Sequence, residues 1–315
     1  MSAIRIFQNV PHDVFKRGLS NVDGNDVRLD LTFSGSAKRL DLGDRFRVFN
    51  ATVNQQTMSV GGATATLETV AAGVSGGRNI VCIGDSRTAP TTGLTYVKLL
   101  KDRFGSDLTL LGTQGSGDWT HEGHSGRNYD WFANDAASPL TDGSGNIDLA
   151  SYVSTIGATP DFVFMWSDVN GRSSIISGGT PENGWDADIA AEVADIQALI
   201  DAWHAVSSSI KVVVAMGPIY GLTDADWVSY NAAFTAGSRD RFRRFMFHRN
   251  ASLVTDFGGQ EASNTYLFPM QLAVDPQGDF PNNDPFHGSA GTSGGRMRMH
   301  AHIERWLAAL LTDIW

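Results

Sequence analysis

The feature that most constrains the fold of this chain is an apolar run that stops at a polar turn. Residues 79–83 read Asn-Ile-Val-Cys-Ile, and Gly-Asp-Ser follows at 84–86. A short continuous apolar run is typical of a strand buried on both faces, as in a parallel sheet between helices. Open sheets of this kind carry their chemistry at the carboxyl ends of the strands. We therefore expect Ser86 at that edge, as a nucleophile if a base can reach it.

The far end of the chain offers such a base. Asp284 and His287 are three residues apart, in the sequence Asp-Pro-Phe-His. This spacing suits a turn in which the carboxylate folds back onto the imidazole. A carboxylate bonded to one ring nitrogen fixes the tautomer, and the other nitrogen can then take a proton from Ser86. We predict a catalytic triad of Ser86, His287 and Asp284.

Acyl transfer by a serine also needs hydrogen-bond donors for the oxyanion. Two segments in the middle of the chain could supply them. The loop at 121–128 contains Gly123 and Gly126, and glycine lets a backbone N–H approach a ligand closely. The apolar run at 162–166 ends in a polar turn that carries Asn170, whose side-chain amide is a donor.

The chain divides into two parts by pattern. Up to about residue 75, short segments alternate apolar and polar residues between turn formers, as at 27–33, 45–49 and 63–67, which predicts a small β-rich module. A Gly- and Ser-rich linker at 71–77 follows. The module could bind carbohydrate, hold a homo-oligomer together or cap the second part, and the sequence leaves these open. We place the domain boundary between residues 75 and 76.

From residue 76 to 315 strands and helices alternate. Apolar runs predict further strands at 107–111, 162–166, 210–216 and 251–254. A long helix follows the segment at 162–166, and a polar helix is expected over 225–247. This alternation predicts a parallel sheet with helices on both faces. The expected apolar stripe of the long helix consists of Trp185, Ile189, Val193, Ile196, Ile200 and Trp203.

Composition excludes several classes of function. The 315 residues carry a formal charge of −10, and binding to nucleic acid needs clustered Lys and Arg, so we expect no nucleic-acid partner. No stretch reaches the ~18 apolar residues of a membrane span, so we expect no membrane partner. The first residues lack the apolar core of a signal peptide, which predicts a cytoplasmic or virion-associated protein rather than a classically secreted one.

With these residues in view, the chain resembles the SGNH (GDSL-type) hydrolase superfamily, which carries Ser, Gly, Asn and His in four blocks in that order. Ser86, Gly126, Asn170 and the pair of Asp284 and His287 match these blocks. The resemblance covers roughly residues 78–315. It implies a flavodoxin-like three-layer α/β/α sandwich and a serine esterase that needs no cofactor. The oxyanion hole would consist of the N–H groups of Ser86 and Gly126 and the amide of Asn170.

Two motifs narrow the resemblance to carbohydrate acetylesterases and deacetylases. The sequence Thr-His-Glu-Gly-His-Ser-Gly at 120–126 is similar to the second block of acetylxylan-esterase-type members. The segment from 267 to 287 is similar to members found in phage and bacterial surface-polysaccharide proteins. The substrate would be an acetylated sugar or polysaccharide. The substrate-binding residues expected beside the triad are Asp85, Gly123, His124 and Trp166.

Two departures from the family pattern are present. The third block usually reads Gly-x-Asn-Asp, whereas here it is Asp-Val-Asn-Gly at 168–171, so Asp168 brings a negative charge to the site. It could orient Asn170 or Arg172, or it could be a solvated carboxylate. The last block usually continues His-Pro, but Gly288 follows His287 here. The altered block also leaves open a non-catalytic carbohydrate-binding or virion structural protein, and a lipase or thioesterase is a further alternative.

Other chemistry-bearing residues have plainer interpretations. Cys82, the one cysteine, is expected to be a buried apolar residue, and it excludes an intramolecular disulfide. His121 and His124 flank Glu122, but the glycines around them predict a loop without an obvious third metal ligand. His300 and His302 fall on different faces of the last helix. Trp119, Trp131 and Trp166 could stack on a sugar, although core packing is the default for tryptophan.

Overall fold

A computed structural model describes the chain in segments, and the account below concerns these segments. They are residues 4–7, 12–15, 31–41, 45–60, 63–70, 77–89, 95–172, 175, 182–218, 220–221, 223–273, 280, 286–287 and 295–311. Contacts divide the chain into two compact units. Unit 1 comprises residues 1–76, 217–247 and 269–315, and unit 2 comprises residues 77–216 and 248–268. The predicted domain boundary at 75/76 stays a prediction, as does the linker, because residues 71–76 lie outside the described segments.

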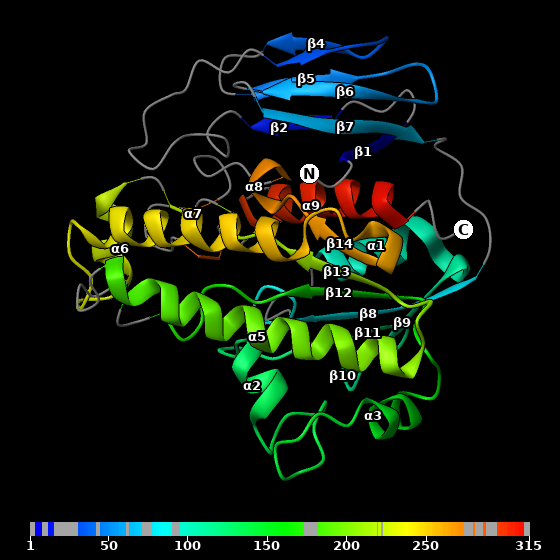
Figure 1. Ribbon diagram of the computed structural model, residues 1–315, viewed down its shortest axis with the longest axis vertical. Coiled ribbons are helices and arrows are strands. Elements are labelled where there is room, and N and C mark those ends of the chain that lie inside the picture. The colour runs from blue at the N-terminus through cyan, green and yellow to red at the C-terminus, as the bar shows by residue number, and fades with distance from the viewer. Residues whose placement is uncertain are drawn as a thin grey trace. The chain divides into compact units, whose positions relative to one another are not determined.

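Unit 2 contains the predicted parallel sheet (Figure 1). Strand β8 (Arg78–Gly84) pairs in parallel with β12 (Phe162–Trp166) on one side. On its other side, β9 (Leu108–Leu111) pairs with the first half of β8 and β11 (Trp119–Gly123) with its end. Strands β13 (Lys211–Ala215) and β14 (Thr265–Phe268) continue the sheet beyond β12, and β10 (Gln114–Ser116) is antiparallel to β11.

This arrangement is the flavodoxin-like order 2-1-3-4-5, with β9 and β11 sharing the place beside β8. The order reverses between β11, β8 and β12. At such a reversal the connections leave the central strand in opposite directions and open a crevice at the carboxyl edge. Ser86 follows β8, so the predicted nucleophile lies at this switch point. The predicted α/β fold class with a parallel sheet is confirmed.

Helices pack on both faces of the sheet. Helix α5 (Glu182–Val206) contacts α2 (Tyr129–Asn134) and α3 (Leu149–Ile156), and its buried residues share one core with the odd-numbered residues of β8 and β12. Figure 1 shows α5 running alongside the sheet. On the other face, Tyr96 of α1 (Tyr96–Phe104) packs edge-on against Phe164, with ring centroids 5.5 Å apart.

The predicted helical stripes are borne out where they are described. Val97, Leu100 and Phe104 of α1 are buried, as expected, while Leu94 lies outside the described segments. Every expected stripe residue of α5 is buried except Val193, which is partly buried against the same core. Because apolar residues three and four apart share a helix face, this stripe could be identified without tertiary information.

One predicted strand is wrong. Residues 251–254 belong to α7 (Ser238–Phe257), and the last strand of the sheet is β14 at 265–268. Leu253 and Phe257 are buried four residues apart, which is the helical period, so the short apolar run at 251–254 is the end of a helical face. The expected polar helix over 225–247 is divided into α6 (Asp224–Tyr230) and the first half of α7.

Unit 1 contains the β module as two small sheets. The first has β1 (Ile4–Phe7), β7 (Ala63–Val70), β6 (Asn54–Val60) and β3 (Thr32–Phe33) in that order. The second has β2 (His12–Phe15), β5 (Arg45–Phe49) and β4 (Lys38–Asp41), and all its described pairs are antiparallel. Among the described pairs of the first sheet, that of β1 and β7 is parallel and the others are antiparallel. The predicted strands at 45–49 and 63–67 are present.

Unit 1 also contains helices outside the β module. Helix α9 (Gly295–Leu311) packs against β1, β2 and α8 (Met270–Ala273). Its apolar face buries Ile303 and Leu307, four residues apart. Among the described residues, no helix is long and apolar enough to cross a membrane.

Candidate active site

Ser86 lies in a tight turn that begins where β8 ends. The backbone carbonyl of Asp85 accepts from the N–H groups of Thr88 and Ala89, at 3.0 and 2.9 Å, so the chain closes one helical turn around the serine. Gly84 is required at the start of this turn, because a Cβ there would lie 2.6 Å from the carbonyl oxygen of Trp166 on the neighbouring strand. Ser86 is half-buried.

A buried charge network lies next to the serine. The Asp85 carboxylate accepts from the backbone N–H and the guanidinium of Arg87, with N···O distances of 3.0 Å and, for Nε, 2.9 Å. Nη2 of Arg87 also binds Asp168 Oδ1 at 2.5 Å, and the guanidinium lies 4.3 Å above the Trp166 ring. The three charged side chains are at most 1% exposed. Burial alone would lower the pKa of Arg87, but the two carboxylates raise it above its usual value.

This network assigns a role to Asp168. Its carboxylate also accepts from Trp166 Nε1 at 3.2 Å, so it is a buried ion-pair partner and not a solvated carboxylate. Sequence reasoning missed Arg87 altogether. An aspartate at the end of a buried strand needs a cation, because an unpaired charge is costly to bury. That requirement was the available signal, but several arginines could have met it.

Asn170 connects three of the predicted loops. Its Nδ2 donates to Asp85 Oδ2 at 3.2 Å and to the carbonyl oxygen of Arg127 at 3.1 Å. Asp85 precedes Ser86, and Arg127 follows Gly126, so the loops after β8, β11 and β12 converge on this one amide. Both amide hydrogens have protein acceptors, so donation to an oxyanion requires the exchange of one of these bonds. The Asn170 oxyanion role stays a prediction.

The two candidate glycines of the oxyanion hole differ in their surroundings. Gly123 is buried, and a Cβ there would lie 2.4 Å from the backbone nitrogen of Ala89, so it lets β11 approach the turn that carries Ser86. Gly126 is exposed and has φ +79°, in the left-handed region that favours glycine, with open space where a Cβ would be. The role of the Gly126 N–H as an oxyanion donor stays a prediction.

His124 is held by a buried carboxylate. Glu122 is fully buried and accepts from Thr113 N, Thr113 Oγ1 and Tyr152 Oη, each at 2.8 Å, and from His124 Nε2 at 2.6 Å. Burial alone would raise the pKa of Glu122, but these hydrogen bonds, that of His124 first, lower it below its usual value. The carboxylate is thus an acceptor, and His124 Nε2 carries the hydrogen. The His124 side chain is 20% exposed, and its backbone N–H donates to Gly84 O at 2.7 Å.

His121 has a structural role. It is buried on β11, and its Nδ1 accepts from the N–H of Gly123 at 2.9 Å. Burial lowers the pKa of His121 to about 4, although the neighbouring Glu122 opposes this effect. The imidazole is therefore neutral at pH 7. Among the described residues, no group of three His, Cys, Asp or Glu side chains could hold a metal ion.

The base of the predicted triad belongs to unit 1. His287 is half-buried and follows Phe286, which is buried among aromatic rings. These rings fix the place of the segment within unit 1, with ring centroids of Trp227 and Phe286 4.9 Å apart. Asp284 lies outside the described residues. The triad of Ser86, His287 and Asp284 stays a prediction. Phe286 also lies within 6.4 Å of the rings of Tyr220, Tyr230, Phe234 and Phe242.

The other expected site residues lie inside the protein. Asp85 and Trp166 are fully buried, and the oxygens of Asp85 bind Arg87 and Asn170, so their contact with substrate stays a prediction. Cys82 is fully buried, and burial raises the pKa of its thiol, which makes it a poor nucleophile, as expected.

Comparisons with known proteins give fold neighbours only. No family model matches the chain, and no curated protein sequence is similar to it. Among solved structures it is similar to a family 3 carbohydrate esterase from Clostridium thermocellum (18% identity, TM-score 0.45, 75% of this chain and 98% of the other). A family 3 carbohydrate esterase from Talaromyces cellulolyticus is similar too (16% identity, TM-score 0.47, 76% of this chain and 100% of the other). A GDSL-like lipase from Parabacteroides merdae is also similar (15% identity, TM-score 0.42, 75% of this chain and 97% of the other). The function is argued below from the residues themselves.

The buried network predicts a large effect of removing its cation. Arg87→Met leaves the carboxylates of Asp85 and Asp168 buried without a partner, and we expect the free energy of unfolding to fall by about 3–5 kcal/mol. Urea-induced unfolding measures the change. Lys98→Met is the matched control, because it breaks an exposed ion pair with Asp102 and should cost about 1 kcal/mol or less. Equal losses in both variants would contradict the role given to Arg87.

The buried imidazole of His121 predicts a pH dependence of stability. Its folded pKa of about 4 lies below the usual value of 6.5, so its contribution is complete above pH 6.5 and is lost as the pH falls toward 4. We expect the wild type to lose about 2 kcal/mol between pH 7.5 and 5 through this residue. In His121→Asn an amide oxygen can still accept from Gly123, but nothing titrates there. Parallel unfolding profiles of the two proteins over this range would refute the prediction.

Proposed function

We propose that this chain is a serine esterase of the SGNH hydrolase superfamily that removes short acyl groups, acetyl above all, from a carbohydrate. The observation that supports it most is the bridge made by Asn170. One amide links the turn of Ser86, through Asp85, to the loop of Gly126, through Arg127. The Ser, Gly and Asn elements of the predicted site thus meet at the switch point of a parallel sheet.

In the proposed reaction, the Ser86 hydroxyl attacks the acyl carbonyl while His287 takes its proton. Asp284 orients His287 and stabilises the imidazolium. The oxyanion is held by the N–H groups of Ser86 and Gly126 and by the Asn170 amide, which exchanges one of its present bonds. His287 then protonates the leaving sugar alkoxide. A water molecule repeats the sequence on the acyl-enzyme and releases the acid.

The buried network affects this reaction by fixing the positions of the turns that carry Ser86 and Asn170. Arg87 is one residue beyond Ser86, and its guanidinium binds both Asp85 and Asp168. The turn after β8 and the turn after β12 are therefore held by one cation. Asp168, which departs from the family pattern, makes this connection. We assign Asp85, Arg87 and Asp168 as positioning residues that fix the Ser86 turn against the Asn170 turn.

We assign His124 to recognition of the sugar. With Nε2–H donated to Glu122, Nδ1 of an unprotonated ring would offer its lone pair as a hydrogen-bond acceptor. The ring is steadied against Trp131, with centroids 4.9 Å apart. It stands at the end of β11, whose last residue pairs with Gly84. A hydroxyl next to the ester would suit this acceptor, whereas a plain alkyl ester would leave it unused.

Replacement of the nucleophile tests the proposal. We expect Ser86→Ala to lower hydrolysis of 4-nitrophenyl acetate by a factor on the order of 10⁴ or more, with its urea midpoint close to that of the wild type. A fluorophosphonate probe should label the wild type and not the variant. Undiminished turnover by Ser86→Ala would exclude this serine.

One observation favours the non-catalytic alternative, a carbohydrate-binding protein on a hydrolase scaffold. Both hydrogens of the Asn170 amide already have acceptors. Absence of fluorophosphonate labelling in the wild type, together with retained glycan binding, would establish that alternative. A series of 4-nitrophenyl esters of increasing chain length separates the lipase or thioesterase, which would prefer long acyl chains over acetate.

The role of His124 predicts a selective loss. His124→Phe keeps a ring against Trp131 but removes the acceptor, so kcat/KM for an acetylated oligosaccharide should fall about tenfold relative to that for 4-nitrophenyl acetate. His124→Gln restores an acceptor and a donor for Glu122 and should recover part of the ratio. The substrate is the glycan from which the wild type releases acetate fastest in a panel. An unchanged ratio in His124→Phe would remove this residue from sugar recognition.

A further inference from the structure

Unit 2 has a cavity at the start of β11, away from Ser86. It has a volume of about 510 Å³ and lies between the α1 helix and the turn that leads into β11. Strand β11 begins at Trp119, in this cavity, and ends at Gly123, beside Gly84. At about 3.3 Å per residue the two ends are roughly 13 Å apart. The cavity is thus at the amino edge of the sheet, opposite the edge that carries the predicted active site.

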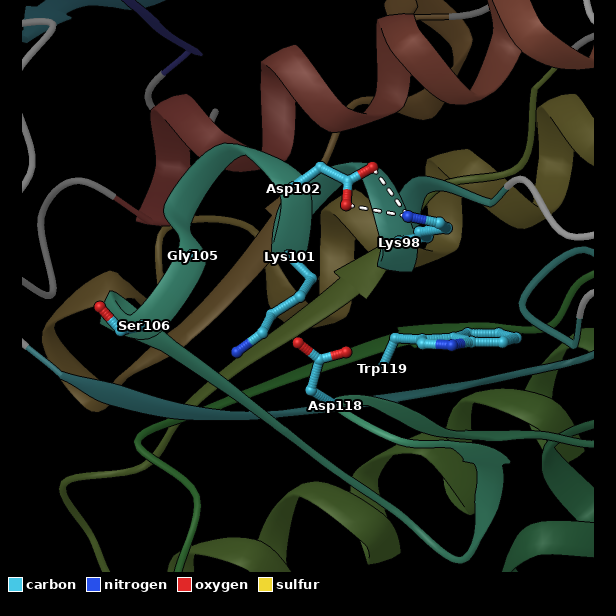
Figure 2. Close-up of a pocket in the computed structure, with 7 residues that line it drawn as sticks. All are labelled: Lys98, Lys101, Asp102, Gly105, Ser106, Asp118 and Trp119. Atoms are coloured by element: carbon cyan, nitrogen blue, oxygen red, sulfur yellow. Dashed lines mark hydrogen bonds and ion pairs between the residues drawn. The ribbon is translucent and has the colours of Figure 1, made fainter.

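The lining combines one aromatic ring with charged side chains (Figure 2). Trp119 is half-buried, and its neighbour on the same face of β11 is His121, with ring centroids 6.1 Å apart. Figure 2 shows Lys101 and Asp118 pointing toward one another beside the indole. Lys101 is held by a 2.7 Å bond from Nζ to the carbonyl oxygen of Leu108. His121, the next residue on this face of β11, is buried, so the strand that carries Trp119 is anchored in the protein. The Lys101 side chain beside it is fixed by its bond to Leu108.

The charges of the lining are balanced. Lys98 and Lys101 are offset by Asp102 and Asp118, and Lys98 Nζ lies 2.9 Å from Asp102 Oδ1. An anionic ligand would gain from the lysines but would meet two carboxylates. An apolar ligand would have to strip water from four charged groups, which is unfavourable. A neutral ligand with many hydroxyls avoids both costs.

We propose that this cavity binds a neutral sugar unit of a polysaccharide. A pyranose ring presents a face of C–H groups, which can lie on the indole of Trp119, and an edge of hydroxyls. Those hydroxyls can donate to Asp102 and Asp118 and accept from Lys98 and Lys101. Tryptophan is suited to this because it offers a large apolar face and few rotatable bonds.

The proposal deepens the proposed esterase function and rests on it for the choice of a polysaccharide. A polymer held at the Trp119 cavity has a raised effective concentration at the catalytic edge of the same unit. A short ester gains nothing from such a site. The cavity would therefore affect KM for polymeric substrates more than kcat, which is the signature expected of a binding site remote from the reacting atoms.

Binding is tested in the Ser86→Ala protein, so that no ligand is consumed. Isothermal titration with xylohexaose, cellohexaose and mannohexaose should detect at least one complex, and adding Trp119→Ala should weaken it fivefold or more. Trp119→Phe keeps a smaller ring and should retain part of the affinity. Phe247→Ala is the matched control, because Phe247 is an aromatic side chain with 51% exposure elsewhere on the chain. Its affinity should equal that of the parent.

Activity gives the second readout, in the protein with Ser86 intact. The ratio of kcat/KM for an acetylated polymer to kcat/KM for 4-nitrophenyl acetate should fall in Trp119→Ala through a rise in KM for the polymer. Asp118→Asn, a smaller change that keeps the indole, should weaken binding in the same direction. It keeps the test decisive if Trp119→Ala does not fold.

Three outcomes would overturn the proposal. No binding of any of the three hexaoses would do so, as would equal affinity in the parent and in Trp119→Ala or Asp118→Asn. Binding of ATP or polygalacturonate that depends on Trp119, without binding of the neutral hexaoses, would assign the cavity to anions instead. Failure of the esterase proposal would appear separately, as undiminished turnover by Ser86→Ala or absence of fluorophosphonate labelling, while the titrations would still report on the cavity.

Discussion

The candidate site depends on one buried cation. Arg87 satisfies the carboxylates of Asp85 and Asp168 from two neighbouring strands, and all three side chains are shielded from water. At such burial the charges attract strongly, but each is costly to leave alone, so the network holds only when complete. The turn that presents Ser86 and the turn that carries Asn170 are therefore fixed to one another. The Asn170 amide adds a second link between the two turns through its bond to Asp85.

A second polar network fixes the neighbouring strand by different means. Glu122 accepts four hydrogen bonds, and one of them orients His124 at the edge of the sheet. His121, one residue earlier, stays neutral and accepts from the backbone of Gly123. Buried carboxylates with full sets of donors are rigid, because any movement leaves an acceptor unpaired. The β11 loop is thus positioned by hydrogen bonding, and the β8 and β12 turns by charge.

Parts of this organisation were predictable and parts were not. The stripe of α5 was correct because helical periodicity is a local property of the chain. The strand predicted at 251–254 was wrong because so short a run, with only three apolar residues, does not distinguish a strand from the end of a helical face. Asp168 was recognised as unusual but could not be paired, since its partner Arg87 is 81 residues away and several arginines were available. The cavity at Trp119 could not be predicted, although Trp119 was one of three tryptophans named as able to stack on a sugar.

The sequence alone established the alternation of strands and helices and the order of the Ser86, Gly126, Asn170 and His287 blocks. It could do so because apolar periodicity and polar residues at strand ends are properties of short segments of the sequence. The tertiary structure decided which side chains form hydrogen bonds and ion pairs with one another. It buried Asp85, gave Asp168 its cation and supplied acceptors for both hydrogens of Asn170. Such contacts join distant segments, and burial fixes their strength, so no local pattern specifies them.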